Sequence, residues 1–198
     1  KNKRIVFNYN DTNFLYCNNS LSSFNFINIL KYFEEISIEI CEQSIIFDSI
    51  FLNVLQIKQN FIQNIKVVLI FNGKKDVGCR FSYNNQINSI QIKPSVTKIE
   101  SRAFSDCLLL REISMCSTVK SVGEFCFSNC ISLKKIDIKS ASIIKIENGL
   151  FNGCSLLKEI TIPFSVEIIG SYAFYGCLSL EKVEMPTTVK SIEYSAFY

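Results

Sequence analysis

Cysteine has the most chemistry to offer in this sequence, because its thiolate binds metals, attacks electrophiles and forms disulfides. The chain has nine cysteines, and four of them lie 23, 24 and 23 residues apart, namely Cys107, Cys130, Cys154 and Cys177. Zinc ligands are often paired as Cys-x-x-Cys, and no such pair is present; the nearest two cysteines are Cys126 and Cys130, for which we prefer a buried, reduced state to a metal site. The spacing therefore predicts equivalent positions in successive repeats, filled by buried and reduced thiols, and no metal site.

Histidine is absent from the chain. Its absence excludes Ser-His-Asp and Cys-His catalysis and histidine metal ligands. The neighbouring carboxylates Glu34 and Glu35 could act in acid-base chemistry, but a charged turn at the end of a helix accounts for them. No glycine-rich phosphate loop, nucleophile elbow or metal signature occurs in the sequence. We therefore expect no catalytic residue, no cofactor and no enzymatic activity.

The composition is that of a globular protein, with 48% hydrophobic and 20% charged residues in a chain of 198. Twenty-one basic and 18 acidic side chains give a net charge of +3, which is too small to attract nucleic acid or a membrane at long range. Lys98, Lys120 and Lys190 recur at equivalent places, but Glu167 interrupts the row, so we expect no nucleic-acid partner. The sequence contains no uninterrupted run of roughly 18 apolar residues, so it predicts no transmembrane segment.

The second half of the chain repeats itself with a period of 23 residues, and one unit has 24. A leucine follows three residues after each of the four regularly spaced cysteines, and one extra residue near positions 142–144 accounts for the longer unit. Phenylalanine keeps the same spacing as these cysteines, at Phe104, Phe127, Phe151, Phe174 and Phe197. Such self-similarity is typical of a solenoid.

Within one unit the spacing of the apolar residues changes. Ile136 and Ile138 alternate as in a strand, whereas Phe127, Cys130 and Leu133 have a helix-like spacing. Each coil is therefore predicted to be a short strand followed by a turn of helix, which is too small to fold alone. The predicted fold class is α/β: a solenoid of stacked coils with a parallel sheet, in which the phenylalanines form a single file.

Three segments are expected along the chain. Residues 90–198 hold about five repeats, and because the last one is truncated we expect the sequence to be part of a longer chain. Residues 67–89, with a turn signal at 71–74, are predicted to be a degenerate capping coil with Val67, Leu69, Phe81 and Ile87 in the core. Residues 1–66 show no copy of the motif. They are predicted to be partly helical, with one helix capped near Ser22 and a helical or mixed segment over 45–65.

The repeat unit is clearest from Ile160 to Leu180, with the pattern Ile-x-Ile-Pro-x-x-Val-x-x-Ile-Gly-x-x-Ala-Phe-x-Gly-Cys-x-x-Leu. Over residues 90–198 the chain resembles the BspA-like leucine-rich repeat family. The resemblance implies a curved array with a parallel sheet on its concave side, and protein binding, often as an adhesin or antigen at a cell surface. The units beginning at Ile113 and Ile136 lack the proline of the pattern, so we expect slight distortion there.

In each strand the residues that flank the buried Ile or Val should point outward, because side chains alternate across a strand. Two columns of candidate protein-binding residues are therefore expected on the concave face. The second column alternates in sign, so mutual support between strands is the alternative to contact with a partner. The first column is Gln91, Ser114, Asp137, Thr161 and Glu184, and the second is Glu112, Lys135, Glu159 and Lys182.

Four tyrosines form another candidate contact area around the turns, with plain packing as the alternative. They are Tyr172, Tyr175, Tyr194 and Tyr198.

The leading functional hypothesis is a non-catalytic protein that binds a protein partner through its repeats, in the manner of a cell-surface adhesin or antigen. The alternative is an intracellular scaffold or assembly subunit, in which residues 1–66 dock one partner and the coils hold another. Nine scattered cysteines favour a reducing compartment. The sequence therefore leaves two alternatives for the location of the protein, the cell surface and the cytoplasm.

Overall fold

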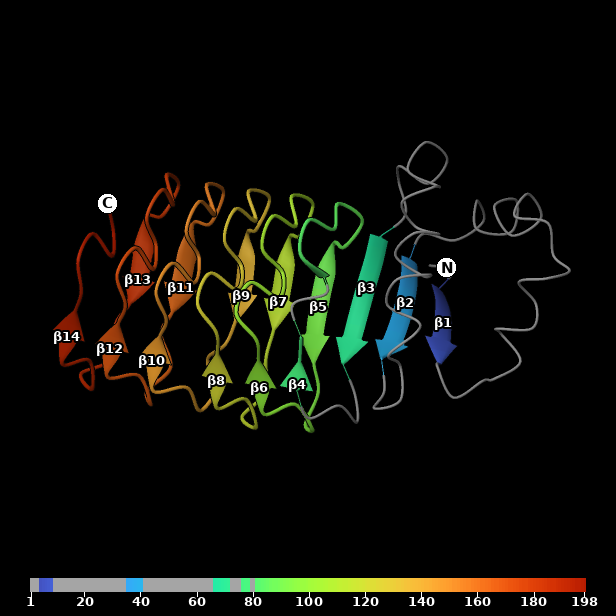
Figure 1. The fold of residues 1–198 in the computed structure, drawn as a ribbon, viewed down its shortest axis with the longest axis horizontal. Helices are drawn as coiled ribbons and strands as arrows, with labels where there is room; N and C mark the ends of the chain where they lie inside the picture. The colour runs from blue at the N-terminus through green and yellow to red at the C-terminus, as the bar shows by residue number, and fades with distance from the viewer. Residues whose placement is uncertain (1–3, 9–34, 41–65, 72–75, 79–80) are drawn as a thin grey trace, which may run out of the picture.

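The described part of the chain winds into a solenoid. A computed structural model describes residues 4–8, 35–40, 66–71, 76–78 and 81–198 (Figure 1). Strands on one side form what we call the long-strand face: β1 (Arg4–Asn8), β2 (Glu35–Ile40), β3 (Lys66–Phe71), β5 (Ser89–Ile92), β7 (Glu112–Ser114), β9 (Lys135–Asp137), β11 (Glu159–Thr161) and β13 (Lys182–Glu184). Two-residue strands on the other side form the short-strand face: β4 (Asp76–Val77), β6 (Lys98–Ile99), β8 (Ser121–Val122), β10 (Lys145–Ile146), β12 (Ile168–Ile169) and β14 (Ser191–Ile192).

Every strand pair in these sheets is parallel, as predicted from the repeat. Equivalent residues of successive coils face each other, so that Ile90 pairs with Ile113, and Ile113 with Ile136. Each of these isoleucines is flanked by polar residues, whose side chains lie outside or half-buried except for Ser89, which is buried. The period of the sequence thus sets the register of the sheet.

The extra residue of the 24-residue unit interrupts both faces. It lies between β9 and β10, and the ladders end there: one sheet stops at β9 before a separate β11–β13 pair, and another stops at β8 before β10–β12–β14. The third side of the solenoid is not interrupted, because the Phe127 amide donates to the Leu150 carbonyl at 3.0 Å. The irregular unit is therefore held mainly through its turns.

The third side of each coil is built from turns, so the predicted turn of helix is wrong. Successive hydrogen bonds of 3.4 and 2.9 Å join Cys130 to Phe127 and Leu133 to Cys130, and this run of three-residue turns has the spacing that suggested a helix. Phe125 and Asn129 have positive φ values of 54° and 57°, so the amides between coils can point along the solenoid axis. No helix occurs in the residues that the structure describes, and there the fold is a parallel β-solenoid rather than α/β.

The core contains a single file of stacked phenylalanines, as predicted. Ring centroids lie 5.4, 5.5, 5.8, 5.5 and 5.0 Å apart along the file Phe81, Phe104, Phe127, Phe151, Phe174 and Phe197. Rings that repeat at the spacing of the coils bury one another's faces. This file joins the coils where the strand ladders are short.

The sheet continues on the N-terminal side of residues 67–89, because β3 pairs with β2 as well as with β5, and β2 pairs with β1. Leu69, Phe81 and Ile87 are buried in the core. The helix predicted near Ser22 and the helical or mixed segment predicted over 45–65 lie outside the described residues, as does the turn predicted at 71–74 apart from Phe71, which ends β3.

Candidate functional site

The long-strand face carries the two predicted columns of polar side chains. In the register of the strands, Ser114 lies opposite Gln91 and Asp137, and Thr161 lies opposite Glu184. The second column follows the same order, with Glu112 opposite Lys135, and Glu159 opposite Lys182. The interrupted ladder between β9 and β11 divides each column into two parts. All nine side chains are exposed or half-buried: Gln91, Glu112, Ser114, Lys135, Asp137, Glu159, Thr161, Lys182 and Glu184.

Charged groups on this face pair within a strand as well as between strands. Lys182 Nζ lies 2.6 Å from Glu184 Oε1, and Thr161 Oγ1 donates to Glu184 Oε2 at 2.7 Å. These hydrogen bonds, first from Lys182 and then from Thr161, lower the pKa of Glu184, and the hydrogen bond to Glu184 raises the pKa of Lys182. Lys135 and Asp137 are exposed and make no ion pair with any described residue. Their charges are therefore available to a partner.

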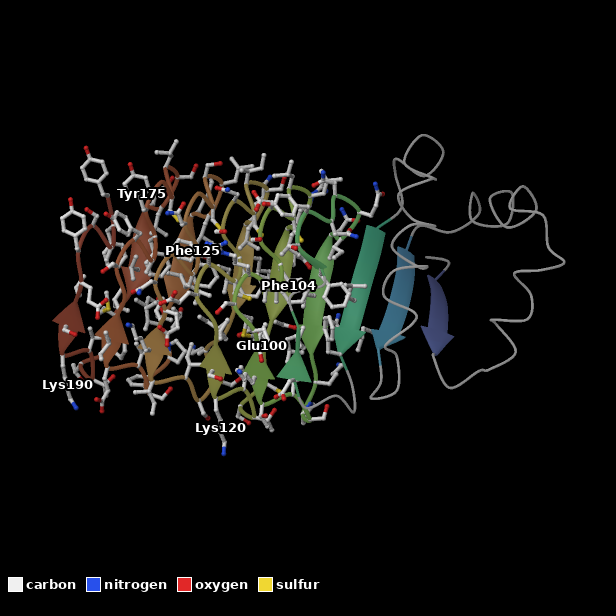
Figure 2. The ribbon with its side chains drawn as sticks, in the orientation of Figure 1. Glu100, Phe104, Lys120, Phe125, Tyr175 and Lys190 are labelled. Atoms are coloured by element: carbon white, nitrogen blue, oxygen red, sulfur yellow. The ribbon has the colours of Figure 1, made fainter. Side chains whose placement is uncertain are left out.

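The four tyrosines lie together on the turns of the last coils. Ring centroids are 5.5 Å apart for Tyr172 and Tyr194 and 5.4 Å apart for Tyr175 and Tyr198. Figure 2 shows Tyr175 projecting from the turns, on the side away from Lys190, which immediately precedes β14. The rings cover one another and leave Tyr194 71% and Tyr198 81% exposed. Packing between coils accounts for the pairing, whereas contact with a partner stays a prediction.

The repeated cysteines form a buried ladder of hydrogen bonds. The Sγ atoms of Cys107, Cys130, Cys154 and Cys177 each donate to the carbonyl of the phenylalanine of the preceding coil, at 3.1 to 3.3 Å. Burial raises the pKa of Cys107 to about 12 and of Cys177 to about 11, and it also raises the pKa of Cys130 and Cys154. The thiols stay protonated at neutral pH and are poor nucleophiles. Their role is to fill the core and satisfy buried carbonyls.

One regularity of the short-strand face was missed by the sequence analysis. The residue that follows each short strand alternates between glycine and glutamate, in the order Gly78, Glu100, Gly123, Glu147, Gly170 and Glu193. Coils are about 4.8 Å apart, so glutamates in every second coil avoid the repulsion of like charges in adjacent coils. Aligning the units on their phenylalanines would have revealed this alternation.

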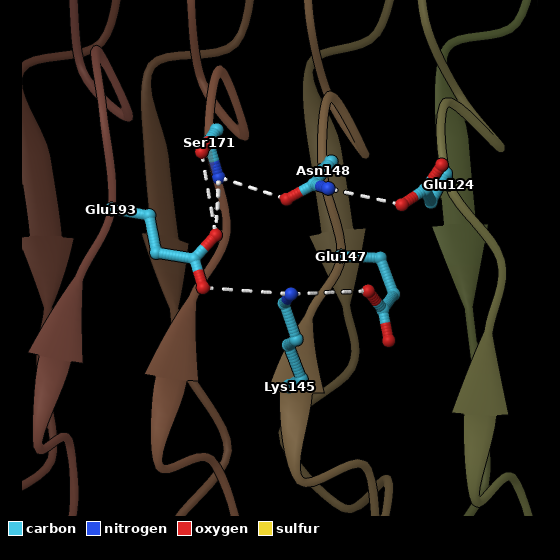
Figure 3. A network of polar contacts seen from close by, with 6 residues as sticks. All are labelled: Glu124, Lys145, Glu147, Asn148, Ser171 and Glu193. Carbon is cyan, nitrogen blue, oxygen red and sulfur yellow. Dashed lines mark hydrogen bonds and ion pairs between the residues drawn. The ribbon is translucent and has the colours of Figure 1, made fainter.

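Two of these glutamates, Glu147 and Glu193, belong to a polar network across four consecutive coils (Figure 3). Lys145 Nζ lies 3.6 Å from both Glu147 Oε2 and Glu193 Oε1. Glu193 Oε2 also accepts the Ser171 amide at 3.1 Å. Asn148 Nδ2 donates to Glu124 Oε1 at 3.0 Å, across the gap between β8 and β10. The network therefore links coils whose strand ladder is interrupted.

Neither a metal centre nor a membrane span is found in the part of the chain that the structure describes. No three His, Cys, Asp or Glu side chains there are grouped so that they could hold a metal ion. No helix there is long and apolar enough to cross a membrane.

Stacked turns of this kind, with a Phe and a Cys in each coil, match a known repeat. Six copies of the BspA type leucine rich repeat region cover residues 76–198. The chain belongs to this family. The match begins within the predicted capping coil, so the BspA-type repeats extend further toward the N terminus than residue 90. A search of the curated proteins finds no match to the chain.

Solved structures of bacterial repeat proteins are similar. A leucine-rich repeat protein from Bacteroides ovatus has a TM-score of 0.60 and 29% identity, over 80% of this chain and 39% of that chain. One from Eubacterium ventriosum has a TM-score of 0.55 and 19% identity, over 83% of this chain and 58% of that chain. A leucine rich cell surface protein from Faecalibacterium prausnitzii has a TM-score of 0.47 and 18% identity, over 82% of this chain and 60% of that chain. The BspA-type chain thus spans less than two thirds of each of these proteins.

Proposed function

We propose that this protein is a non-catalytic recognition module that binds another protein through the long-strand face. The observation that carries the proposal is the pair of polar columns, which the parallel register holds in fixed positions from Gln91 to Asp137 and again from Glu159 to Glu184. A rigid array loses little conformational entropy on binding, so its contacts contribute more fully to affinity. Membership of the BspA-type family supports this role, and a place at a cell surface as an adhesin or antigen is part of the proposal.

Site-specific photocrosslinking tests the proposed face. A benzophenone side chain at Asp137 is expected to capture a protein partner from extracts of the source organism and from its extracellular environment, because Asp137 is exposed in the first column. The matched control places the same group at Lys120, which is exposed beside β8 on the short-strand face (Figure 2). Equal capture from both positions would contradict the proposal.

A charge exchange gives the corresponding prediction for a variant. Lys135→Glu combined with Asp137→Lys keeps the net charge. With the benzophenone side chain moved to Ser114, which lies opposite Asp137 in the same column, this exchange should abolish capture by reversing the charges that a partner meets. Both exchanged side chains are exposed, so the free energy of unfolding should change by less than about 0.5 kcal/mol. Denaturant unfolding and crosslinking on the same variant separate binding from folding. Unchanged capture would exclude these two residues from the binding face.

An intracellular scaffold is the second candidate, and the free thiols favour it. The described residues include six free cysteines, of which only Cys116 is not fully buried. Unpaired cysteines are common in reducing compartments and rarer in secreted proteins. In this alternative the repeats hold one partner and residues 1–66 dock another.

Alkylation of the protein as isolated, without reductant, separates these two candidates. In the scaffold, iodoacetamide at about pH 8 should modify all nine cysteines after denaturation. In the native protein, Cys107 and Cys177, whose pKa values are raised to about 12 and about 11, should stay unmodified while Cys116 reacts. Mass spectrometry of the peptides measures both samples. Oxidised cysteines in the denatured sample would exclude the scaffold, and rapid native modification of Cys107 would contradict the buried ladder.

A further inference from the structure

A row of exposed aliphatic side chains lies at the corner between the turns and the long strands. In each coil a turn closes from the cysteine to the leucine three residues later, as from Cys107 to Leu110 at 3.0 Å, and both of these residues are buried. The two residues between them face outward. Polar residues are common at such turn positions, but here they include Leu108, Leu109, Ile131 and Leu156, which are 36%, 42%, 45% and 44% exposed.

A row of basic side chains runs beside this apolar row. Arg111, Lys134 and Lys158 occupy the same position in three successive coils, just before β7, β9 and β11, and all three are exposed. None of them makes an ion pair with a described residue, whereas Lys98, Lys145, Lys182 and Lys190 each do. We call the exposed aliphatic and basic residues of 107–111, 130–134 and 154–158 the basic ridge. In Figure 1 these segments lead into the upper ends of the three strands.

Backbone hydrogen bonds join the coils that carry these cations. The Arg111 carbonyl accepts the amides of Lys134 and Lys135 at 3.0 and 3.1 Å, and the Lys158 carbonyl accepts those of Glu181 and Lys182 at 2.8 and 3.2 Å. Between the coils of Lys134 and Lys158, where the strand ladder is interrupted, the bond lies in the turns, since the Asn129 amide donates to the Asn152 carbonyl at 2.7 Å. Adjacent coils are about 4.8 Å apart, so the three cations span about 10 Å along the solenoid axis. A helix rises about 1.5 Å per residue, which puts its residues i, i+3 and i+7 at about 0, 4.5 and 10.5 Å on one face.

We propose that the basic ridge docks an amphipathic helix of a partner protein, with acidic residues at i, i+3 and i+7 opposite Arg111, Lys134 and Lys158. Apolar residues beside these acids cover the exposed leucines and Ile131. The next coil carries Glu181 in place of a cation, at about 14 Å from the start of the row. A basic residue at i+10 of the same helix lies about 15 Å along and faces Glu181. This surface is separate from the long-strand face and does not depend on the function proposed above.

The charges around the ridge favour a helix over an anionic membrane. Glu112 and Glu159 stand beside the basic row, and Glu181 ends it. A bilayer with anionic lipids presents negative charge everywhere and would repel these three carboxylates. A helix has discrete charges, so it can place acids opposite the cations and a base opposite Glu181.

A synthetic helical peptide tests the proposal. The probe carries Glu at positions 1, 4 and 8, Lys at position 11, and leucines beside them, and its binding is measured by fluorescence anisotropy. The control peptide has the same composition with its charged residues moved to the opposite helix face. Saturable binding of the probe that weakens with salt and exceeds that of the control supports the proposal. Equal binding of both peptides, or no binding of the probe up to about 1 mM, overturns it.

Matched variants locate the site. Arg111→Gln, Lys134→Gln and Lys158→Gln together should weaken probe binding about tenfold, because exposed charge pairs each contribute a factor of roughly 1.4 to 5. Lys93→Gln, Lys120→Gln and Lys139→Gln remove as much charge from exposed positions outside the ridge and should leave binding unchanged. Equal losses in both triple variants would mean non-specific attraction and overturn the proposal. So would flotation of the parent, but not the ridge variant, with vesicles containing about 30% phosphatidylserine.

Discussion

Phe151→Ala is expected to lower the free energy of unfolding by about 3 to 5 kcal/mol. The Phe151 ring is fully buried, and its centroid lies 5.8 Å from that of Phe127 and 5.5 Å from that of Phe174. The cavity cannot collapse easily, because the Phe151 amide donates to the Ala173 carbonyl at 2.8 Å and fixes the coil spacing. The ring also stands in the irregular coil, where the strand ladders are interrupted and the core must hold the stack together. Denaturant unfolding followed by circular dichroism measures the loss.

Phe164→Ala is the matched control, since it removes the same ring from a position in the next coil that is 73% exposed. Its free energy of unfolding should stay within about 0.5 kcal/mol of the parent. A parent-like stability for Phe151→Ala would mean that the phenylalanine file does not support the solenoid.

Gly123→Ala is expected to cost about 1 to 3 kcal/mol by overpacking. A Cβ atom at Gly123 would stand 2.3 Å from the Ser101 amide nitrogen and 2.6 Å from its Cα. The clash can be relieved only if the two coils separate, because the atoms in contact belong to the backbone. Separation would strain the hydrogen bond from the Gly123 amide to the Ile99 carbonyl, which is 2.8 Å long. The melting temperature and the denaturant midpoint should both fall.

Gly78 provides the control at the equivalent position of an earlier coil. An added Cβ at Gly78 meets no atom of a described residue within 4 Å, so Gly78→Ala should leave stability within about 0.5 kcal/mol of the parent. Equal losses in the two variants would contradict overpacking against Ser101 as the cause. Equal stability would show that adjacent coils can move apart at little cost.

The repeat made the strands, their parallel order and the phenylalanine file predictable. Chain neighbours alternate between core and surface in a strand, and a strict period aligns equivalent residues, so Ile113 and Phe127 could be placed without coordinates. The polar columns followed from the same register. Their role in binding did not, because an exposed charge such as Lys135 has the same sequence pattern whether it meets a partner or solvent.

The turns could not be predicted from the sequence, because three-residue turns and a helix produce nearly the same spacing of apolar residues. Positive φ at a phenylalanine is uncommon, yet Phe125 adopts it, as do Arg102, Gly149, Tyr172 and Ser195 at the equivalent position of other coils. The Phe125 ring lies under the Arg102 guanidinium, 5.5 Å from the ring centroid, and beside Gly149, where a Cβ would clash with the ring. The network of Lys145 and Glu193 was likewise hidden, since it joins residues two coils apart.

The sequence by itself determined the period, the register and the identity of the core, because apolar residue types recur at 23-residue intervals and apolar side chains are buried. Only the tertiary structure decided that each coil closes through turns, and that one added residue interrupts both faces but leaves the third intact. It also decided that the cations of the basic ridge make no ion pair with a described residue, whereas Lys98 and Lys190 do. The physical reason is that these features depend on contacts between neighbouring coils, and such contacts exist only after the coils have stacked.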